Sequence, residues 1–164
     1  MKKACRSCGN STQTPQVQNV THGLCPACTE MILGNPDRLQ SFLNKIEVPT
    51  LLMQSNPRLV VTANHGAQVL FGKSPAQVSG LRGGQVFECR HSFSEAGCGL
   101  DENCLNCTIK EAVIETLTTG VSQNEVQTVL PIKTPHGFEA YGVSIATERI
   151  GPSALLAIRS FTRI

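Results

Sequence analysis

The chain has 164 residues, of which 40% are apolar, 16% charged and 4% aromatic, with no Trp and one Tyr. This length suits one ordinary domain with a small appendage and is too short for two full-sized cores. The composition excludes a disordered tail, and so few aromatic rings argue against a stacking surface for single-stranded nucleic acid. The net charge of +2 is far below the concentrated positive charge that phosphate binding requires, so nucleic acid is not expected as the main partner.

The start of the chain carries no targeting signal that we can identify. Lys2 and Lys3 are not followed by an apolar segment, so this is not a secretory signal. No stretch approaches the roughly 18 consecutive apolar residues of a membrane helix. We therefore predict a cytoplasmic protein with no membrane partner. In that reducing compartment, cysteines serve metal binding or redox chemistry more often than a disulfide framework.

The eight cysteines form two blocks of four, separated by sixty residues. The first block consists of two C-x2-C pairs, Cys5 with Cys8 and Cys25 with Cys28. Two such pairs complete a tetrahedron of thiolates around a soft divalent ion, which predicts a zinc site. The polar stretch between the pairs could hardly build a core unaided, and a metal would supply the missing stability. With four cysteines available, His22 is expected to face solvent.

The first block also has a family resemblance. Residues 5–9 (CRSCG) together with residues 21–28 (THGLCPAC) resemble the zinc-ribbon or knuckle modules attached to bacterial signalling proteins. The resemblance implies a small module with structural zinc over residues 1–34. The alternative use of the Cys25–Cys28 pair is thiol–disulfide exchange, which would need a preceding strand that the polar residues before it do not offer.

A helix is predicted over residues 35–48. Asn35 is a good N-cap, and Pro36 is tolerated in the first turn. An apolar stripe follows at helical spacing, formed by Leu39, Phe42, Leu43 and Ile46. The stripe packs on the chain's own domain or forms a dimer contact.

Strands and short helices are predicted next. Residues 51–54 and 58–62 are typical of strands, joined by a turn. Helical spacing then begins after Asn64 and is interrupted by glycines at Gly72, Gly80 and the pair Gly83–Gly84, which indicates short helices.

The longest helix is predicted to begin at Thr108, where Thr108 and Glu111 form a capping box, and to end at Gly120. Three strands close the chain as an antiparallel meander, residues 126–133, 138–147 and 154–162. Because the helices are segregated from the strands instead of alternating with them, the fold class is α+β.

The sequence of this region resembles that of a PAS domain. Residues 56–64 (NPRLVVTAN) resemble the family's second strand, which frequently ends in Asn, and residues 70–74 (LFGKS) and 78–83 (VSGLRG) match its two glycine-punctuated turns. The resemblance implies a PAS-like antiparallel sheet flanked by helices over residues 35–164, with an N-terminal helix at 35–48 and a core at 50–164. It also implies a sensory and interaction module that dimerises through its sheet face or N-terminal helix and, in many members, holds a ligand between sheet and helices.

The second block of cysteines falls in an insertion, residues 89–107, where a PAS domain passes from its short helices to its long one. Its members are Cys89, Cys98, Cys104 and Cys107. Cys107 directly precedes the predicted helix, whose dipole favours a thiolate. The site could hold zinc as a structural clip, an iron–sulfur cluster as a sensor of oxygen or redox state, or reversible disulfides. Asp101 and Glu102 would have to face water, because they would repel a tetrathiolate.

Two familiar PAS cofactors are not expected. The family's flavin photoreceptors carry the motif Asn-Cys-Arg-Phe-Leu-Gln, with which residues 88–91 (ECRH) share only Cys and Arg. Haem would need an axial ligand, and the histidines fall in predicted turns or loops, where solvent exposure is the default. These four are His22, His65, His91 and His136.

Three functions compete. The first is a non-enzymatic signalling module, a homodimer that passes a redox, oxygen or ligand signal by contact to a separate effector chain such as a kinase or regulator. In a variant of this function both four-cysteine sites are structural zinc in an interaction adaptor. The second is a dithiol oxidoreductase acting through a C-x2-C pair. The third is a nucleic-acid adaptor using Lys2, Lys3 and Arg6.

Overall fold

The computed structural model describes residues 3–4, 11–12 and 24–164. The chain begins with a pair of two-residue strands, β1 (Lys3–Ala4) and β2 (Ser11–Thr12). The elements that follow are α1 (Pro26–Leu33), α2 (Pro36–Asn44), β3 (Thr50–Met53), β4 (Val60–Ala63), α3 (His65–Phe71), α4 (Pro75–Val78), α5 (Gly83–Phe87), the 3-10 helices η3 (Arg90–Phe93) and η4 (Glu102–Cys104), α6 (Thr108–Thr119), β5 (Gln123–Thr134), β6 (Gly137–Ile150) and β7 (Ser153–Arg163).

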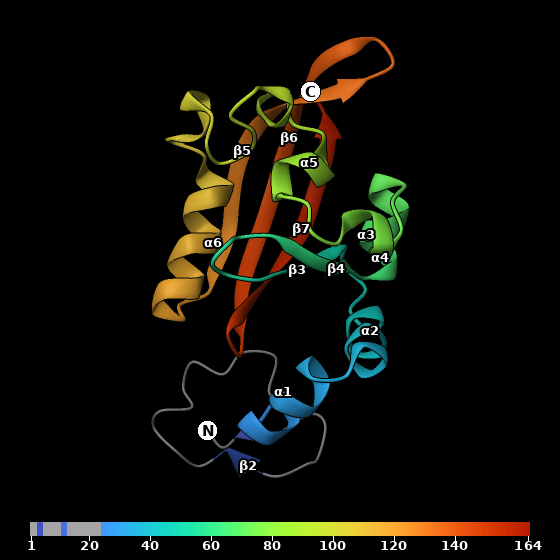
Figure 1. The fold of residues 1–164 in the computed structure, drawn as a ribbon, viewed down its shortest axis with the longest axis vertical. Coiled ribbons are helices and arrows are strands. Elements are labelled where there is room, and N and C mark those ends of the chain that lie inside the picture. Colours follow the sequence, from blue (N-terminus) through green and yellow to red (C-terminus); the bar gives the residue numbers. More distant parts are fainter. Residues whose placement is uncertain (1–2, 5–10, 13–23) are drawn as a thin grey trace.

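Strands β3 to β7 form an antiparallel sheet with the order β4-β3-β7-β6-β5 (Figure 1). The predicted meander is confirmed as β5, β6 and β7, each reaching beyond its predicted bounds, and β3 adds to the free side of β7 with Leu51 opposite Leu156. The segregation of sheet and helices confirms the α+β class.

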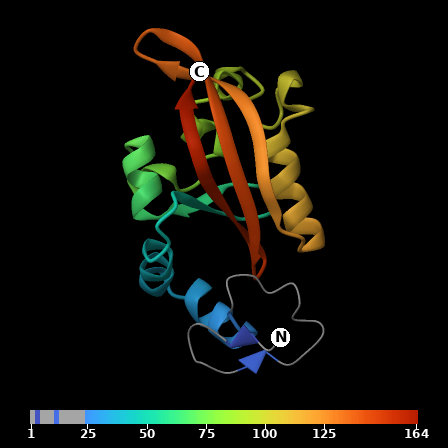
Figure 2. The same cartoon turned by 180° about the vertical axis from the view of Figure 1, so that it is seen from behind.

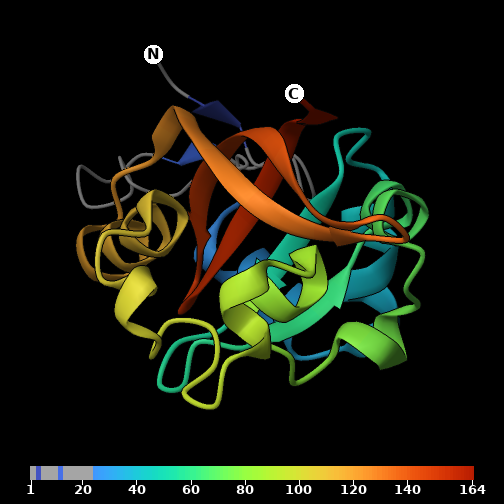
Figure 3. The ribbon, with the colours of Figure 1, turned by 90° about the horizontal axis from the view of Figure 1, so that it is seen from above.

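Helices cover the sheet on both faces. Neighbouring residues of a strand point to opposite faces, so the strands contribute apolar side chains to a core on each side. On the first face, Leu51 and Leu156 pack with α3 to α6 in one buried core. Figures 1 and 3 show this layer running from α6 at one side of the sheet, over α5, to α3 and α4 at the other. On the second face, Leu52 and Leu155 pack with α1 and α2 in a separate core. Viewed from behind (Figure 2), α1 and α2 lie toward the end of the sheet where β6 turns into β7.

Helix α2 confirms one of the two alternatives for its apolar stripe. Asn35 caps the helix, with its Oδ1 accepting from the backbone N–H groups of Asp37 at 3.1 Å and Arg38 at 3.2 Å. Leu39 and Leu43 are buried in the core of the second face. The stripe therefore packs on the chain's own sheet.

Asn64 ties the strands to the short helices that follow. Its side chain is fully buried at the end of β4. The Oδ1 accepts from the backbone N–H groups of Thr50 at 2.8 Å and Ala67 at 3.0 Å, so it both joins β3 and caps α3. The Nδ2 donates to the carbonyls of Ile46 and Val48, each at 2.9 Å. The predicted short helices are confirmed as α3, α4 and α5.

Two local predictions need correction. Helix α1 was not predicted: it begins directly after Cys25, with Pro26 in its first turn, and Cys28 packs in the core of the second face. The capping box at Thr108 is wrong, because the helix begins one residue too early for it. Cys107 is the N-cap of α6 and makes no side-chain cap. The predicted end of α6 is confirmed, since Gly120 adopts a left-handed conformation with φ +77°.

Candidate functional site

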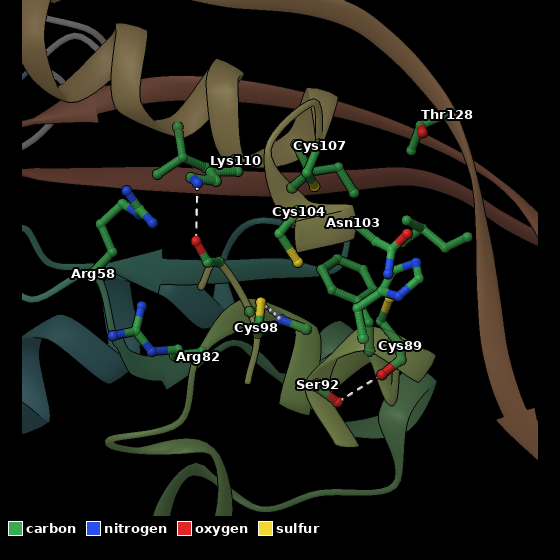
Figure 4. Close-up of a pocket in the computed structure, with 18 of the residues that line it drawn as sticks. Arg58, Arg82, Cys89, Ser92, Cys98, Asn103, Cys104, Cys107, Lys110 and Thr128 are labelled. Carbon is green, nitrogen blue, oxygen red and sulfur yellow. Dashed lines mark hydrogen bonds between the residues drawn. The ribbon is translucent and has the colours of Figure 1, made fainter. Parts of the chain in front are cut away.

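A cavity of about 200 Å³ lies between the helices and the first face of the sheet (Figure 4). Its walls come from β3, α5, the loop of residues 89–107, the first turns of α6, and strands β5 and β7. This is the position that the PAS resemblance predicts for a ligand.

All four cysteines of the second block line this cavity, and all four are free thiols. Cys89 follows α5 and forms an isolated β-bridge with Ile132, which anchors the start of the loop to β5. Cys104 is the last residue of η4, and Cys107 is the N-cap residue of α6. In Figure 4 the sulfur atoms of Cys98 and Cys104 point toward one another in the middle of the cavity. The loop thus brings together side chains that lie up to 18 positions apart in the sequence.

Gly84 positions Cys98. The Gly84 N–H donates to the Cys98 Sγ at 3.2 Å. A Cβ at position 84 would lie 2.6 Å from that sulfur, so only glycine leaves space for it. The spacing of Gly83–Gly84 predicted a helix break and gave no sign of this contact.

Burial in the cavity favours the neutral form of two thiols, Cys89 and Cys98. Burial raises the pKa of Cys89 from 9.0 to about 11; the hydrogen bond from the backbone of His91 opposes this, and the charges of the other three cysteines add to it. Burial also raises the pKa of Cys98, against the opposing effects of the Gly84 N–H and Arg82. These mutual effects mean that the four sulfurs are close enough to influence one another. Among the described residues, however, no group of three or more His, Cys, Asp or Glu side chains is arranged to hold a metal ion.

The charged side chains of the cavity wall are all basic. They are Arg58, Arg82 and Lys110, and no Asp or Glu from the described ranges lines the cavity. Asp101 accepts from the backbone of Asn103 at 2.8 Å and lies 3.9 Å from His91. Its pKa is lowered, first by a hydrogen bond with Ser94 and then by Asn103. Glu102 is exposed. All three acidic residues of the loop, Glu95, Asp101 and Glu102, therefore stay out of the cavity wall, as a negatively charged centre would require.

Sequence reasoning missed the three basic residues and His91. The bases come from the β3–β4 connection, the residue before α5 and the first turn of α6, so no local spacing relates them. Lys110 did carry a signal, because a cation in the first turn of a helix opposes the helix dipole. His91 was expected to face solvent, but it is half-buried and lines the cavity.

The first block of cysteines is described only in part. Cys25 is half-buried and Cys28 is buried, at the start of α1. Cys5, Cys8 and His22 lie outside the described residues, so the zinc site and the module over residues 1–34 stay predictions.

No helix in the described ranges is both long enough and apolar enough to cross a membrane.

Comparison with known proteins identifies the fold. No protein-family model matches the chain, and no curated protein matches it. Among solved structures, the chain is similar to a variant of RsLOV at 17% identity and a TM-score of 0.50, covering 74% of this chain and 65% of that one. It is also similar to the LOV protein of Rhodobacter sphaeroides at 18% identity and a TM-score of 0.50, covering 76% and 67%.

A third similar structure is the PAS domain of a protein from Colwellia psychrerythraea, at 14% identity and a TM-score of 0.49, covering 77% of this chain and 96% of that domain. The chain spans somewhat less than two thirds of the length of the RsLOV variant. Its fold is that of the PAS and LOV domains.

Proposed function

We propose that this chain is a sensory module of the PAS type whose signal is received by the four cysteines in the cavity. One observation carries the proposal: Cys89, Cys98, Cys104 and Cys107 come from separate points of the 89–107 loop, yet all four line one cavity. Four cysteines scattered at random over a loop would be expected to face different ways. A shared cavity is the arrangement that four cysteines need in order to bind one metal ion or cluster together.

The cofactors that four cysteines bind are zinc and iron–sulfur clusters. Both bind thiolates, so loading must displace protons from the thiols, including Cys89 and Cys98, whose pKa burial has raised. The positive charge of the metal supplies that energy. Because the four side chains share the cavity without forming a metal-binding geometry, loading would draw the loop inward. That movement would act on η3 and on the start of α6, and would give the module two states.

An iron–sulfur cluster would make the site a sensor, because the oxidation state and the stability of the cluster respond to oxygen and to the redox state of its surroundings. Zinc would make it a structural clip. We propose that the output is contact with a separate effector chain, made by a cytoplasmic homodimer without catalysis of its own. The four cysteines Cys5, Cys8, Cys25 and Cys28 would hold structural zinc.

Elemental analysis and absorption spectra of protein purified without oxygen test the proposal. We expect iron with sulfide and a visible absorption band, or zinc, that is lost in Cys98→Ser and in Cys104→Ser. The matched control is Cys25→Ser, which should remove only the zinc of the first block. A colourless protein with two zinc ions would make the second site structural. Metal content that is unchanged by both Cys98→Ser and Cys104→Ser would refute a metal site in the cavity.

A further inference from the structure

We propose that the basic end of the cavity binds the carboxylate or phosphate group of a small organic anion. This goes beyond the metal site and does not depend on it, because it rests on Arg58, Arg82 and Lys110 and not on the cysteines. In Figure 4 the three basic side chains lie together at one end of the cavity, and Cys89 and Asn103 lie at the other.

The three cations converge on one residue, Gly99. Lys110 Nζ donates to the Gly99 carbonyl at 2.9 Å. A Cβ on Gly99 would lie 3.1 Å from Arg58 Nη2 and 3.5 Å from Arg82 Nη1, so both guanidinium groups pack against its Cα. Gly99 has φ +83°, a conformation that glycine adopts without strain. Its missing side chain leaves the guanidinium groups space beside the cavity.

Within the described part of the chain, these three cations are in no ion pair. The ion pairs between described residues are Lys73 with Glu88, His91 with Asp101 and Arg163 with Glu139. None of them includes Arg58, Arg82 or Lys110. Three positive charges gathered in a half-buried place repel one another more strongly than they would in bulk water. An anion bound among them would remove this repulsion.

The N-terminus of helix α6 adds to the positive charge at this end of the cavity. Lys110 lies in its first turn, where the dipole of a 12-residue helix already contributes positive charge. The N-cap residue, Cys107, offers no side-chain acceptor to the backbone N–H groups of that turn. Glu111 lies in the same turn and offsets part of this positive charge, but unlike Lys110 it does not line the cavity. An anion bound in the cavity would therefore meet the positive side of this turn.

The cavity also limits the size and shape of the ligand. Its volume of about 200 Å³ is below the ~300–1,000 Å³ usual for larger ligands, which selects a small molecule. Arginine pairs with planar carboxylates and with phosphates through two parallel hydrogen bonds, so Arg58 and Arg82 suit either group. The wall beyond the bases includes apolar side chains, among them Met53, Val113 and Leu156. The ligand would thus have one anionic group and a short apolar body.

Calorimetric titration at constant ionic strength tests this with three probes: succinate, inorganic phosphate and uncharged succinamide. We expect saturable binding of succinate, phosphate or both, and none of succinamide. The double variant Arg58→Gln with Arg82→Gln should bind at least tenfold more weakly, and Lys110→Gln should bind more weakly than the unaltered chain. The control is Arg159→Gln on β7, which is exposed and does not line the cavity. Thermal melting of each variant shows whether it is folded.

The outcomes distinguish a phosphate ligand from a carboxylate ligand. They also distinguish failure of the anion site from failure of the cysteine site. Binding of phosphate alone would assign a phosphorylated ligand, and binding of succinate alone a carboxylate. The proposal is overturned if neither anion shows saturable binding. It is also overturned if the Arg and Lys variants bind the anion with the same affinity as the unaltered chain. It is also overturned if binding appears only after all four cysteines are replaced by Ser, because the cations would then neutralise the thiolates themselves. Metal content measured in the same samples reports on the cysteine site independently.

Discussion

At the residue scale, glycine decides how Cys98 and its surroundings are arranged. Gly84 lets the Cys98 sulfur lie against the first turn of α5, and Gly99 lets two arginines approach the backbone next to that cysteine. Both sites depend on contacts between segments that are distant in the sequence. The pair Gly83–Gly84 predicted only an interruption between short helices, and the sequence could not show which side chains would fill the space that each glycine leaves.

Gly84→Ala is expected to displace Cys98, whereas Gly83→Ala next to it is not. The added Cβ at position 84 would overlap the sulfur, while a Cβ at position 83 meets no atom within 4 Å. Overpacking of this kind costs about 1–3 kcal/mol. Urea unfolding should show that loss for Gly84→Ala only, together with faster reaction of the Cys98 thiol with a disulfide reagent. Equal stability of the two variants would contradict the packing described here.

The raised pKa of Cys89 predicts how the metal-free protein responds to alkali. Between pH 9.0 and about 11 the thiol ionises in the unfolded chain but remains protonated in the folded one. The folded state then holds more protons, so the free energy of unfolding falls as the pH rises through this range and is fully retained below it. Chemical unfolding at a series of pH values should show a steeper fall for the unaltered chain than for Cys89→Ala. Identical slopes would show that Cys89 does not titrate in this way.

At the element scale, the loop of cysteines is attached to the β5–β6 hairpin through η3. Lys133 of β5 donates its backbone N–H to the Glu88 carbonyl at 3.0 Å, just before Cys89. Phe93 of η3 meets Phe138 of β6 with ring centroids 5.9 Å apart. Lys133 lies over the Phe93 ring at 5.1 Å, and Arg90 over the Phe138 ring at 5.6 Å. A change in the loop would therefore reach the sheet through this cluster.

A double-mutant cycle with Phe93→Ala and Phe138→Ala measures this attachment. Both rings are about half exposed, at 52% and 45%, so each single change should be modest. Aromatic pairs contribute about 0.5–1.5 kcal/mol beyond the area that they bury, and we expect a coupling energy in that range. Urea unfolding of the four proteins gives the coupling, and a value of zero would show that the rings do not hold the loop.

The main elements followed from local pattern. The apolar stripe of α2, the glycine at the end of α6 and the alternation of the closing strands each reflect forces within a few residues. Helix α1 was missed because Cys25 and Cys28 pointed to a metal-binding turn. Its helical state is supported by packing of Cys28 and Ile32 on the sheet, which local spacing does not reveal.

At the scale of the whole molecule, the two faces of the sheet bury two separate cores. Leu43 of α2 is fully buried on the second face, among Leu52, Ile150 and Leu155 of the sheet. Gly151, in the β6–β7 turn, lies so close to α1 that a Cβ there would meet Leu33 at 2.9 Å. Helices α1 and α2 are thus packed on the sheet, and we expect them to unfold together with it.

Leu43→Ala tests this cooperativity. Loss of a buried leucine side chain costs about 2–5 kcal/mol, and the loss should appear in one transition that includes the sheet. Met31→Ala is the control, because Met31 of α1 is 52% exposed. Unfolding followed by circular dichroism and by hydrogen exchange in β3 and β7 should coincide. A separate early transition of the helices would contradict a single folding unit.

Cysteine spacing, capping residues and hydrophobic alternation were enough to predict the α+β class, the order of most elements and the four cysteines of the cavity. Those signals depend on residues that are near one another along the chain. The basic end of the cavity could not be predicted in this way. Arg58, Arg82 and Lys110 belong to three segments, and they meet at Gly99 only after the sheet and α6 bring those segments together.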